Sequence, residues 1–176
     1  MRKLITTIAL VAITTIGFTQ KIDGANSYIE FEIDNMIFNT VEGKITGMTG
    51  TVNFNESDLS HSGFNVCIDP ASVDTDSEDR DKHLQNADFF DVSKYTTICF
   101  TSTSITKDGS SYRVKGKLTL FDTTSNEEIT FKIEGNKLVG EMEIDRFDYN
   151  LAVKEYDGTA MVGDDVTIKI VCTLIK

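Results

Sequence analysis

Apolar and polar positions alternate with a period of two along almost the whole chain after residue 27. Between residues 28 and 33, for example, every second residue is a large apolar one: Ile29, Phe31 and Ile33. This alternation is typical of β-strands that bury one face. The same pattern recurs in the segments 41–47, 52–54, 64–68, 112–120, 129–133, 138–144 and 168–174. The chain is therefore predicted to be mostly β.

Short polar segments separate these runs and predict turns, at Asn55–Ser57, Lys107–Gly109, Glu134–Asn136 and Val162–Asp164. Successive hairpins predict an antiparallel sheet, and about eight strands usually close into a barrel or a sandwich. Glycines on the inward-facing positions 43, 47, 116 and 140 fit a strongly bent sheet or a partly open lumen. We predict an antiparallel β-barrel of about eight strands, which can hold one small apolar ligand.

The outward-facing positions of the predicted strands are mostly Glu, Lys, Asp and Thr. A barrel of the outer-membrane type needs an apolar outer face, so this class of β-barrel is excluded.

The alternation stops between residues 74 and 93, where acidic residues predominate. Asp76 or Ser77 can cap a short helix with acidic residues in its first turn. We therefore predict a helix insertion near residues 76–90. The apolar residues expected to hold it over one mouth of the sheet are Leu84, Phe89 and Phe90.

The N-terminal segment 1–20 has the pattern of a secretory signal peptide. Basic Arg2 and Lys3 precede an apolar run from Leu4 to Phe18, which is too short and too rich in threonine for a typical membrane span. A buried N-terminal strand is the alternative. With the signal peptide removed, residues 21–176 would form one domain in the periplasm or outside the cell, without an integral membrane span.

The charge balance narrows the choice of partners. The chain has 28 acidic and 17 basic residues and a net charge of −11. Binding to nucleic acid or to anionic lipid needs clustered Lys and Arg, so neither is expected as a partner.

Three cysteines are present, and an exported protein can keep paired ones oxidised. Cys67 and Cys99 lie in two strand-like runs, and they form a plausible disulfide if those strands pair. Cys172 shares its face with apolar neighbours and is predicted to be a buried, inert thiol. No spacing of cysteines suggests a structural zinc site.

The helix insertion and the strand-like runs after it carry a set of recognisable motifs. They are Ser72–Thr75, Arg80–Leu84, Asp88–Asp91, Lys94–Tyr95, Ile98–Phe100, Val114–Leu120 and Ile144–Tyr149. In these segments the sequence resembles the YceI-like family of secreted lipid- or polyisoprenoid-binding proteins, although Asn26 and Thr96 stand where the family usually has His and Pro. The resemblance implies an extended lipocalin-like barrel that holds a long isoprenoid or fatty chain.

Candidate chemistry is sparse. His61 is predicted to lie in an exposed loop, and His83 is predicted to anchor the helix. A calcium loop starting at Asp74 would need Gly at position 79 and Glu at position 85, where the chain has Asp79 and Gln85. No nucleophile elbow or phosphate loop is present. No metal, cofactor or catalytic activity is expected.

Arg146 continues the inward-facing positions of the strand before it. A charge inside a lumen must be paired, so Arg146 either contacts the polar end of a ligand or pairs with an acid such as Asp81 or Asp148. The helix residues Arg80 and Asp81 face the same two alternatives. The full set of expected ligand contacts is Phe31, Arg80, Asp81, His83, Phe89, Phe90, Phe100, Tyr112, Leu118 and Arg146.

The expected function is that of an exported protein that sequesters or carries a long apolar molecule, such as a polyisoprenoid, an isoprenoid quinone or a fatty-acid derivative. Two alternatives stay open: an interaction or stress-response module with a filled barrel, and a lipid-modifying enzyme with His83 as its first candidate residue. The resemblance and the exposed sheet edges also make a homodimer a reasonable expectation.

Overall fold

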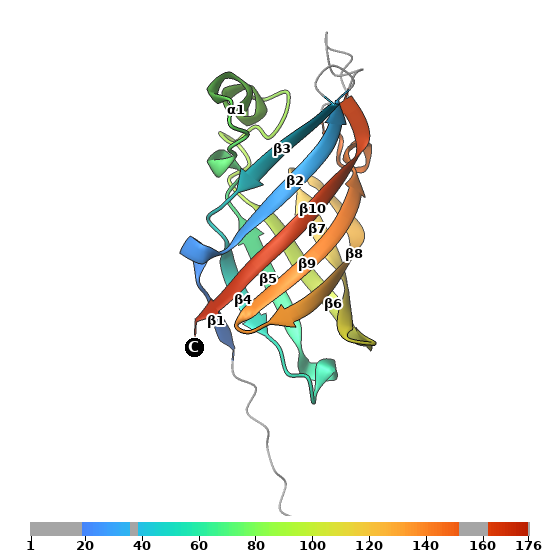
Figure 1. Cartoon of the computed structure of the whole chain (residues 1–176). Helices are drawn as coiled ribbons and strands as arrows, with labels where there is room; N and C mark the ends of the chain where they lie inside the picture. Colours follow the sequence, from blue (N-terminus) through green and yellow to red (C-terminus); the bar gives the residue numbers. More distant parts are fainter. Residues whose placement is uncertain (1–18, 36–38, 152–161, 176) are drawn as a thin grey trace, which may run out of the picture.

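Ten strands form one antiparallel sheet in the computed structural model, which describes residues 19–35, 39–151 and 162–175 (Figure 1). The predicted signal peptide lies outside the described residues except for Thr19 and Gln20. The strands are β1 (Gln20–Ile22), β2 (Tyr28–Asn35), β3 (Asn39–Ile45), β4 (Thr49–Asn53), β5 (Gly63–Ile68), β6 (Ile98–Asp108), β7 (Ser111–Leu120), β8 (Thr123–Glu134), β9 (Lys137–Asp145) and β10 (Val162–Ile175).

The sheet closes into a barrel because β10 pairs with both β1 and β2. Residues Val162–Val171 of β10 pair with β2, while Leu174 and Ile175 pair with β1. In the same way β3 pairs with β2, and β4 pairs with β1. Strands β1 and β2 thus share one position around the barrel, and β3 and β4 share the next, so the ten strands form an eight-position meander. This arrangement confirms the predicted antiparallel barrel of about eight strands.

Two of the predicted turns have the backbone conformation that only glycine adopts easily. Gly109, between β6 and β7, has a φ of +58°, and Gly135, between β8 and β9, has a φ of +66°. The turn predicted at Val162–Asp164 is wrong, because these residues begin β10. The glycine there coincides instead with a shift of register between Val162 and Val166.

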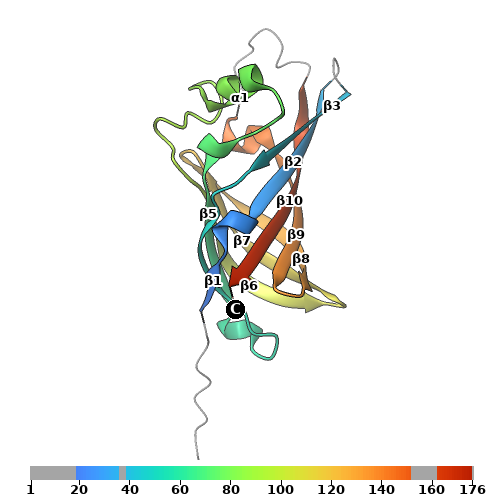
Figure 2. The ribbon, with the colours of Figure 1, turned by 60° about the vertical axis from the view of Figure 1, so that its left-hand side comes forward.

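The insertion between β5 and β6 contains the one α-helix in the described part of the chain, α1 (Glu78–Gln85), with Ser77 at the N-cap position but without a capping hydrogen bond from its side chain. The helix is shorter than the predicted segment 76–90. Figure 1 and the turned view in Figure 2 show it at one end of the barrel, with the β4–β5 loop at the other. The described residues also contain four short 3-10 helices: η1 (Gly24–Asn26), η2 (Leu59–His61), η3 (Pro70–Ser72) and η4 (Arg146–Tyr149).

A backbone pairing and a disulfide are among the links between the insertion and the barrel. Lys44 in β3 and Asp74 exchange backbone hydrogen bonds of 2.8 and 2.9 Å. At the base of the insertion, a disulfide joins Cys67 to Cys99, which lie directly opposite each other on β5 and β6. The predicted disulfide is confirmed. Cys172 is a buried free thiol, as predicted.

No helix in the described ranges has the length and apolar character needed to cross a membrane.

Candidate functional site

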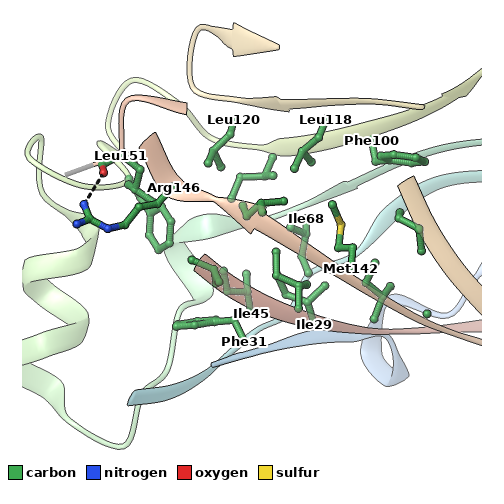
Figure 3. Close-up of a pocket in the computed structure, with 18 of the residues that line it drawn as sticks. Ile29, Phe31, Ile45, Ile68, Phe100, Leu118, Leu120, Met142, Arg146 and Leu151 are labelled. Carbon is green, nitrogen blue, oxygen red and sulfur yellow. Dashed lines mark hydrogen bonds between the residues drawn. The ribbon is translucent and has the colours of Figure 1, made fainter. Parts of the chain in front are cut away.

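The barrel encloses a cavity of about 560 Å³ (Figure 3). Pockets that hold small organic ligands commonly have about 300–1,000 Å³. Most of its lining is aliphatic or aromatic, including Ile29, Phe31, Ile45, Ile68, Phe100, Leu118, Leu120 and Met142. Alternation along each strand produces this apolar wall, because every second side chain points into the barrel. The lumen is therefore open rather than filled.

Two aromatic rings on the wall lie against glycines of neighbouring strands. The ring of Phe31 covers Gly43, and the ring of Phe100 covers Gly116, so closely that a Cβ atom at either glycine would overlap the ring. Two of the four predicted inward-facing glycines, Gly43 and Gly116, thus make room for a large ring against the barrel wall.

Four aromatic side chains close the end of the barrel that lies away from α1. We call this group the aromatic floor; it consists of Phe54, Phe64, Tyr112 and Phe131. Neighbouring ring centroids lie 5.0 to 6.2 Å apart. Phe64 and Phe131 line the cavity, whereas Phe54 and Tyr112 lie behind them.

Tyr112 was expected to contact the ligand, but it does not line the cavity. Its ring stacks on Phe131 at 5.2 Å, and its hydroxyl donates a 2.7 Å hydrogen bond to Glu56 in the β4–β5 loop. This hydrogen bond raises the pKa of Tyr112, because it stabilises the protonated phenol beside a carboxylate. Tyr112 therefore belongs to the outer layer of the floor and supports Phe131 from behind.

The polar side chains of the lining gather at the opposite end, under α1. Asn35 stands at the end of β2, Arg80 and His83 belong to α1, Asp88 follows the helix, and Arg146 begins η4. The cavity is thus amphiphilic along its length, with a polar mouth and an apolar, aromatic-capped interior.

Arg146 lies at this polar mouth and is only 5 % exposed. Its guanidinium donates hydrogen bonds to the backbone carbonyls of Gly163 (2.9 Å), Leu151 (3.2 Å) and Val162 (3.4 Å), and the contact with Leu151 is drawn in Figure 3. The carboxylate of Asp164 lies 3.8 Å away. Arg146 therefore ties η4 to the start of β10, and its described partners do not include the expected acids Asp81 and Asp148.

Arg80 and Asp81 both form hydrogen bonds with Thr75, which lies just before α1. Arg80 Nε donates to the Thr75 hydroxyl at 2.8 Å. Asp81 accepts hydrogen bonds from the Thr75 hydroxyl and backbone amide, at 2.6 and 2.8 Å. This network fixes the start of the helix. Arg80 also lines the cavity, whereas Asp81, another expected ligand contact, does not.

Apolar and aromatic side chains on α1 and just after it cover the mouth. The ring of His83 packs edge-to-face against Phe89 at 4.8 Å, and Phe90 is buried near Phe121. Leu84, His83, Phe89 and Phe90 all line the cavity, so the predicted docking of the helix over one mouth is observed.

Of the ten expected ligand contacts, the structure brings eight to the cavity: Phe31, Arg80, His83, Phe89, Phe90, Phe100, Leu118 and Arg146. Sequence reasoning missed Phe64, Phe131, Asn35 and Asp88. The inward-facing positions of Phe64 and Phe131 were visible in the alternation, but their height in the barrel was not. Among the described residues, no group of three or more His, Cys, Asp or Glu could hold a metal ion.

Comparison with known proteins places these features in a family context. The family model of the YceI-like domain matches residues 20–174. A UPF0312 protein of Pectobacterium atrosepticum is 38% identical over 113 residues, which are 64% of this chain and 59% of that protein. Protein YceI of Escherichia coli O157:H7 is 37% identical over the same length and shares. The match thus spans about three fifths of these relatives.

Solved structures share the fold. BcnA of Burkholderia cenocepacia superimposes with a TM-score of 0.78 at 24% identity, covering 88% of this chain and 99% of BcnA. A polyisoprenoid binding domain from Saccharophagus degradans, implicated in plant cell wall breakdown, gives a TM-score of 0.64 at 14% identity, with 88% and 96% covered. At these identities, the likeness establishes the fold alone.

Proposed function

This chain belongs to the YceI-like domain family, and we propose on that premise that it binds one long apolar molecule inside its barrel without changing it chemically. The ligand class is a polyisoprenoid, an isoprenoid quinone or a fatty-acid derivative. The observation that carries the proposal is the continuous apolar wall around a cavity of about 560 Å³.

Burial alone supplies the affinity. Each methylene group moved from water into an apolar lumen contributes about 0.8 kcal/mol, so a chain of several carbons can bind without any covalent step. A filled barrel with its function on the outer surface does not fit this cavity. The Saccharophagus degradans structure is that of a polyisoprenoid binding domain, which supports the same ligand class for the shared fold.

The proposed location is the periplasm or the exterior of the cell. The Cys67–Cys99 disulfide supports it, because such bonds persist mainly in oxidising compartments. A carrier there would shield a poorly soluble chain from water.

Native mass spectrometry can test the proposal on full-length protein purified from its export route without detergent. We expect the wild type to carry, or to take up on addition, one isoprenoid or fatty molecule. Met142→Trp should weaken uptake, because Met142 is a buried cavity residue in the middle of β9 and the larger indole obstructs the lumen there.

Glu143→Trp is the matched control, because Glu143 is the next residue of β9 and is exposed on the outer face. This variant should bind as the wild type does. Only the ligand-free mass for the wild type after addition of isoprenoids, or equal uptake by the two tryptophan variants, would contradict the proposal.

A further inference from the structure

We infer that the aromatic floor sets the length of the apolar tail that the barrel accepts. Phe64 and Phe131 act as the stop, with Phe54 and Tyr112 behind them. This inference rests on the proposed function and narrows its ligand class. The preferred ligands are single-tailed amphiphiles whose tail reaches from the α1 mouth to the floor, and carbons beyond that length gain no affinity.

Two rings of the floor belong to the cavity lining, and the other two do not. Phe64 on β5 and Phe131 on β8 line it and approach each other to 5.5 Å, edge to face. The next rings, Phe54 and Tyr112, are not part of the lining. The ring centroids of Phe54 and Tyr112 lie 5.4 and 5.2 Å from that of Phe131. A tail that passed Phe131 would therefore meet a second layer of rings.

The second layer is held in place. Tyr112 is only 4 % exposed, and its hydroxyl is bound to Glu56 in the loop that covers this end of the barrel. Phe131 is only 3 % exposed. Edge-to-face and stacked ring contacts favour defined orientations, so the floor resists displacement by a tail.

The opposite end determines which way the ligand lies. All the polar side chains of the lining are at the α1 mouth, among them Arg80, His83 and Arg146. A polar head group pushed against the floor would lose its hydrogen bonds with water and find only phenylalanine rings. The head group therefore stays at the mouth, and the tail enters first.

The distance from mouth to floor follows from the strands. Between Arg146 at the mouth and Gly140, which pairs with Phe131, the chain covers about 20 Å of extended strand. Strands in such barrels are tilted by about 40°, so the usable depth is on the order of 15 Å.

The measurable consequence is a break in the dependence of affinity on chain length. Below the break, each added methylene is buried and strengthens binding by about fourfold. Beyond it, added carbons have no apolar surface to contact. We propose to measure the affinity for saturated primary alcohols of increasing length, in competition with the fluorescent probe ANS and below the solubility limit of each alcohol.

Phe64→Ala should move the break to longer alcohols, because it removes one ring of the stop. Phe31→Ala is the matched control: it removes the same ring from the wall of β2, above the floor. It should weaken binding of all alcohols alike and leave the break in place.

Val66→Phe tests the same idea in the opposite direction and keeps it testable if Phe64→Ala does not fold. Val66 lines the cavity on β5, between Phe64 and the α1 end. The added ring should move the break to shorter alcohols. The inference is overturned if the wild type binds alcohols without a break, or if Phe64→Ala and Val66→Phe leave the break at the same chain length. If the wild type binds no alcohol of any length, the proposed function fails together with it.

Discussion

Cys67 and Cys99 lie directly opposite each other on β5 and β6, and their disulfide, with Cα atoms 4.1 Å apart, closes a loop that contains the whole α1 insertion. The residues that cover the polar mouth, such as Arg80 and Phe90, all belong to this loop. The bond therefore ties both ends of the covering segment to the barrel wall.

Replacing both bridge residues, Cys67→Ser with Cys99→Ser, should lower the free energy of unfolding by about 3–4 kcal/mol. The bond spans 32 residues, and opening it restores the entropy of that loop to the unfolded chain. Urea denaturation followed by circular dichroism measures the change. Unchanged stability of the double variant would contradict the prediction.

The thiol of Cys172 should be inert in the folded protein. Burial raises its pKa from the ordinary value of 9.0 to about 11. Iodoacetamide should therefore leave it unmodified at mildly alkaline pH and alkylate it once urea unfolds the chain. Rapid alkylation of the folded protein would argue against this environment.

The same pKa shift makes stability depend on pH. The unfolded thiol loses its proton at a lower pH than the folded one, so the stabilising contribution is complete below pH 9 and is lost as the pH rises to about 11. Denaturation curves of the wild type and Cys172→Ala across this range should show the difference. Parallel pH profiles of the two proteins would refute the assignment.

Arg146→Met should destabilise the fold by about 2–3 kcal/mol, because it removes the shared donor of the Gly163 and Leu151 carbonyls at a buried site. Arg113→Met is the control. Arg113 is partly exposed and pairs with Asp108 and Glu128 on the outer face, where such pairs contribute about 1 kcal/mol or less. Urea denaturation measures the free energy of unfolding of both variants. Equal losses would show that the burial of Arg146 does not increase its contribution to stability.

Gly116→Ala should cost about 1–3 kcal/mol of stability, since its Cβ would overlap the Phe100 ring and lie 2.6 Å from the backbone oxygen of Thr101. Gly63→Ala offers a comparison within another strand. Its Cβ would meet only the Ser102 hydroxyl, at an ordinary 3.6 Å, so little change in the thermal midpoint is expected. A larger loss at position 63 than at 116 would reverse this reasoning.

Much of the site was predictable from local patterns. Phe31, Phe100 and Leu118 were expected in the lumen because alternation reports which face of a sheet a side chain occupies. The Cys67–Cys99 bond was expected on the condition that the two strand-like runs pair, and these runs do pair as β5 and β6.

Other residues could not be placed in this way. Tyr112 has the same inward-facing alternation as Leu118, yet it does not line the cavity. Alternation carries no information on the height of a side chain along the barrel axis. The partners of Arg146 were missed because they are backbone carbonyls, which every residue carries and no side-chain pattern marks. Gly163 is typical of a turn, but β2 pairs with Val162 and Val166 on either side of it, and β10 therefore extends through it.

The sequence by itself determined most of the strands, the facing of their side chains and the presence of a helix insertion, because each depends on neighbours in the chain. It also identified Cys67 and Cys99 as a disulfide pair on the condition that their strands pair. Only the tertiary structure decided that β10 closes the barrel against β1, that the polar residues meet at one mouth, and that Phe64 and Phe131 line the cavity whereas Tyr112 does not. These features depend on the stagger of strands around a closed ring, which sums many long-range pairings and is not encoded at any single position.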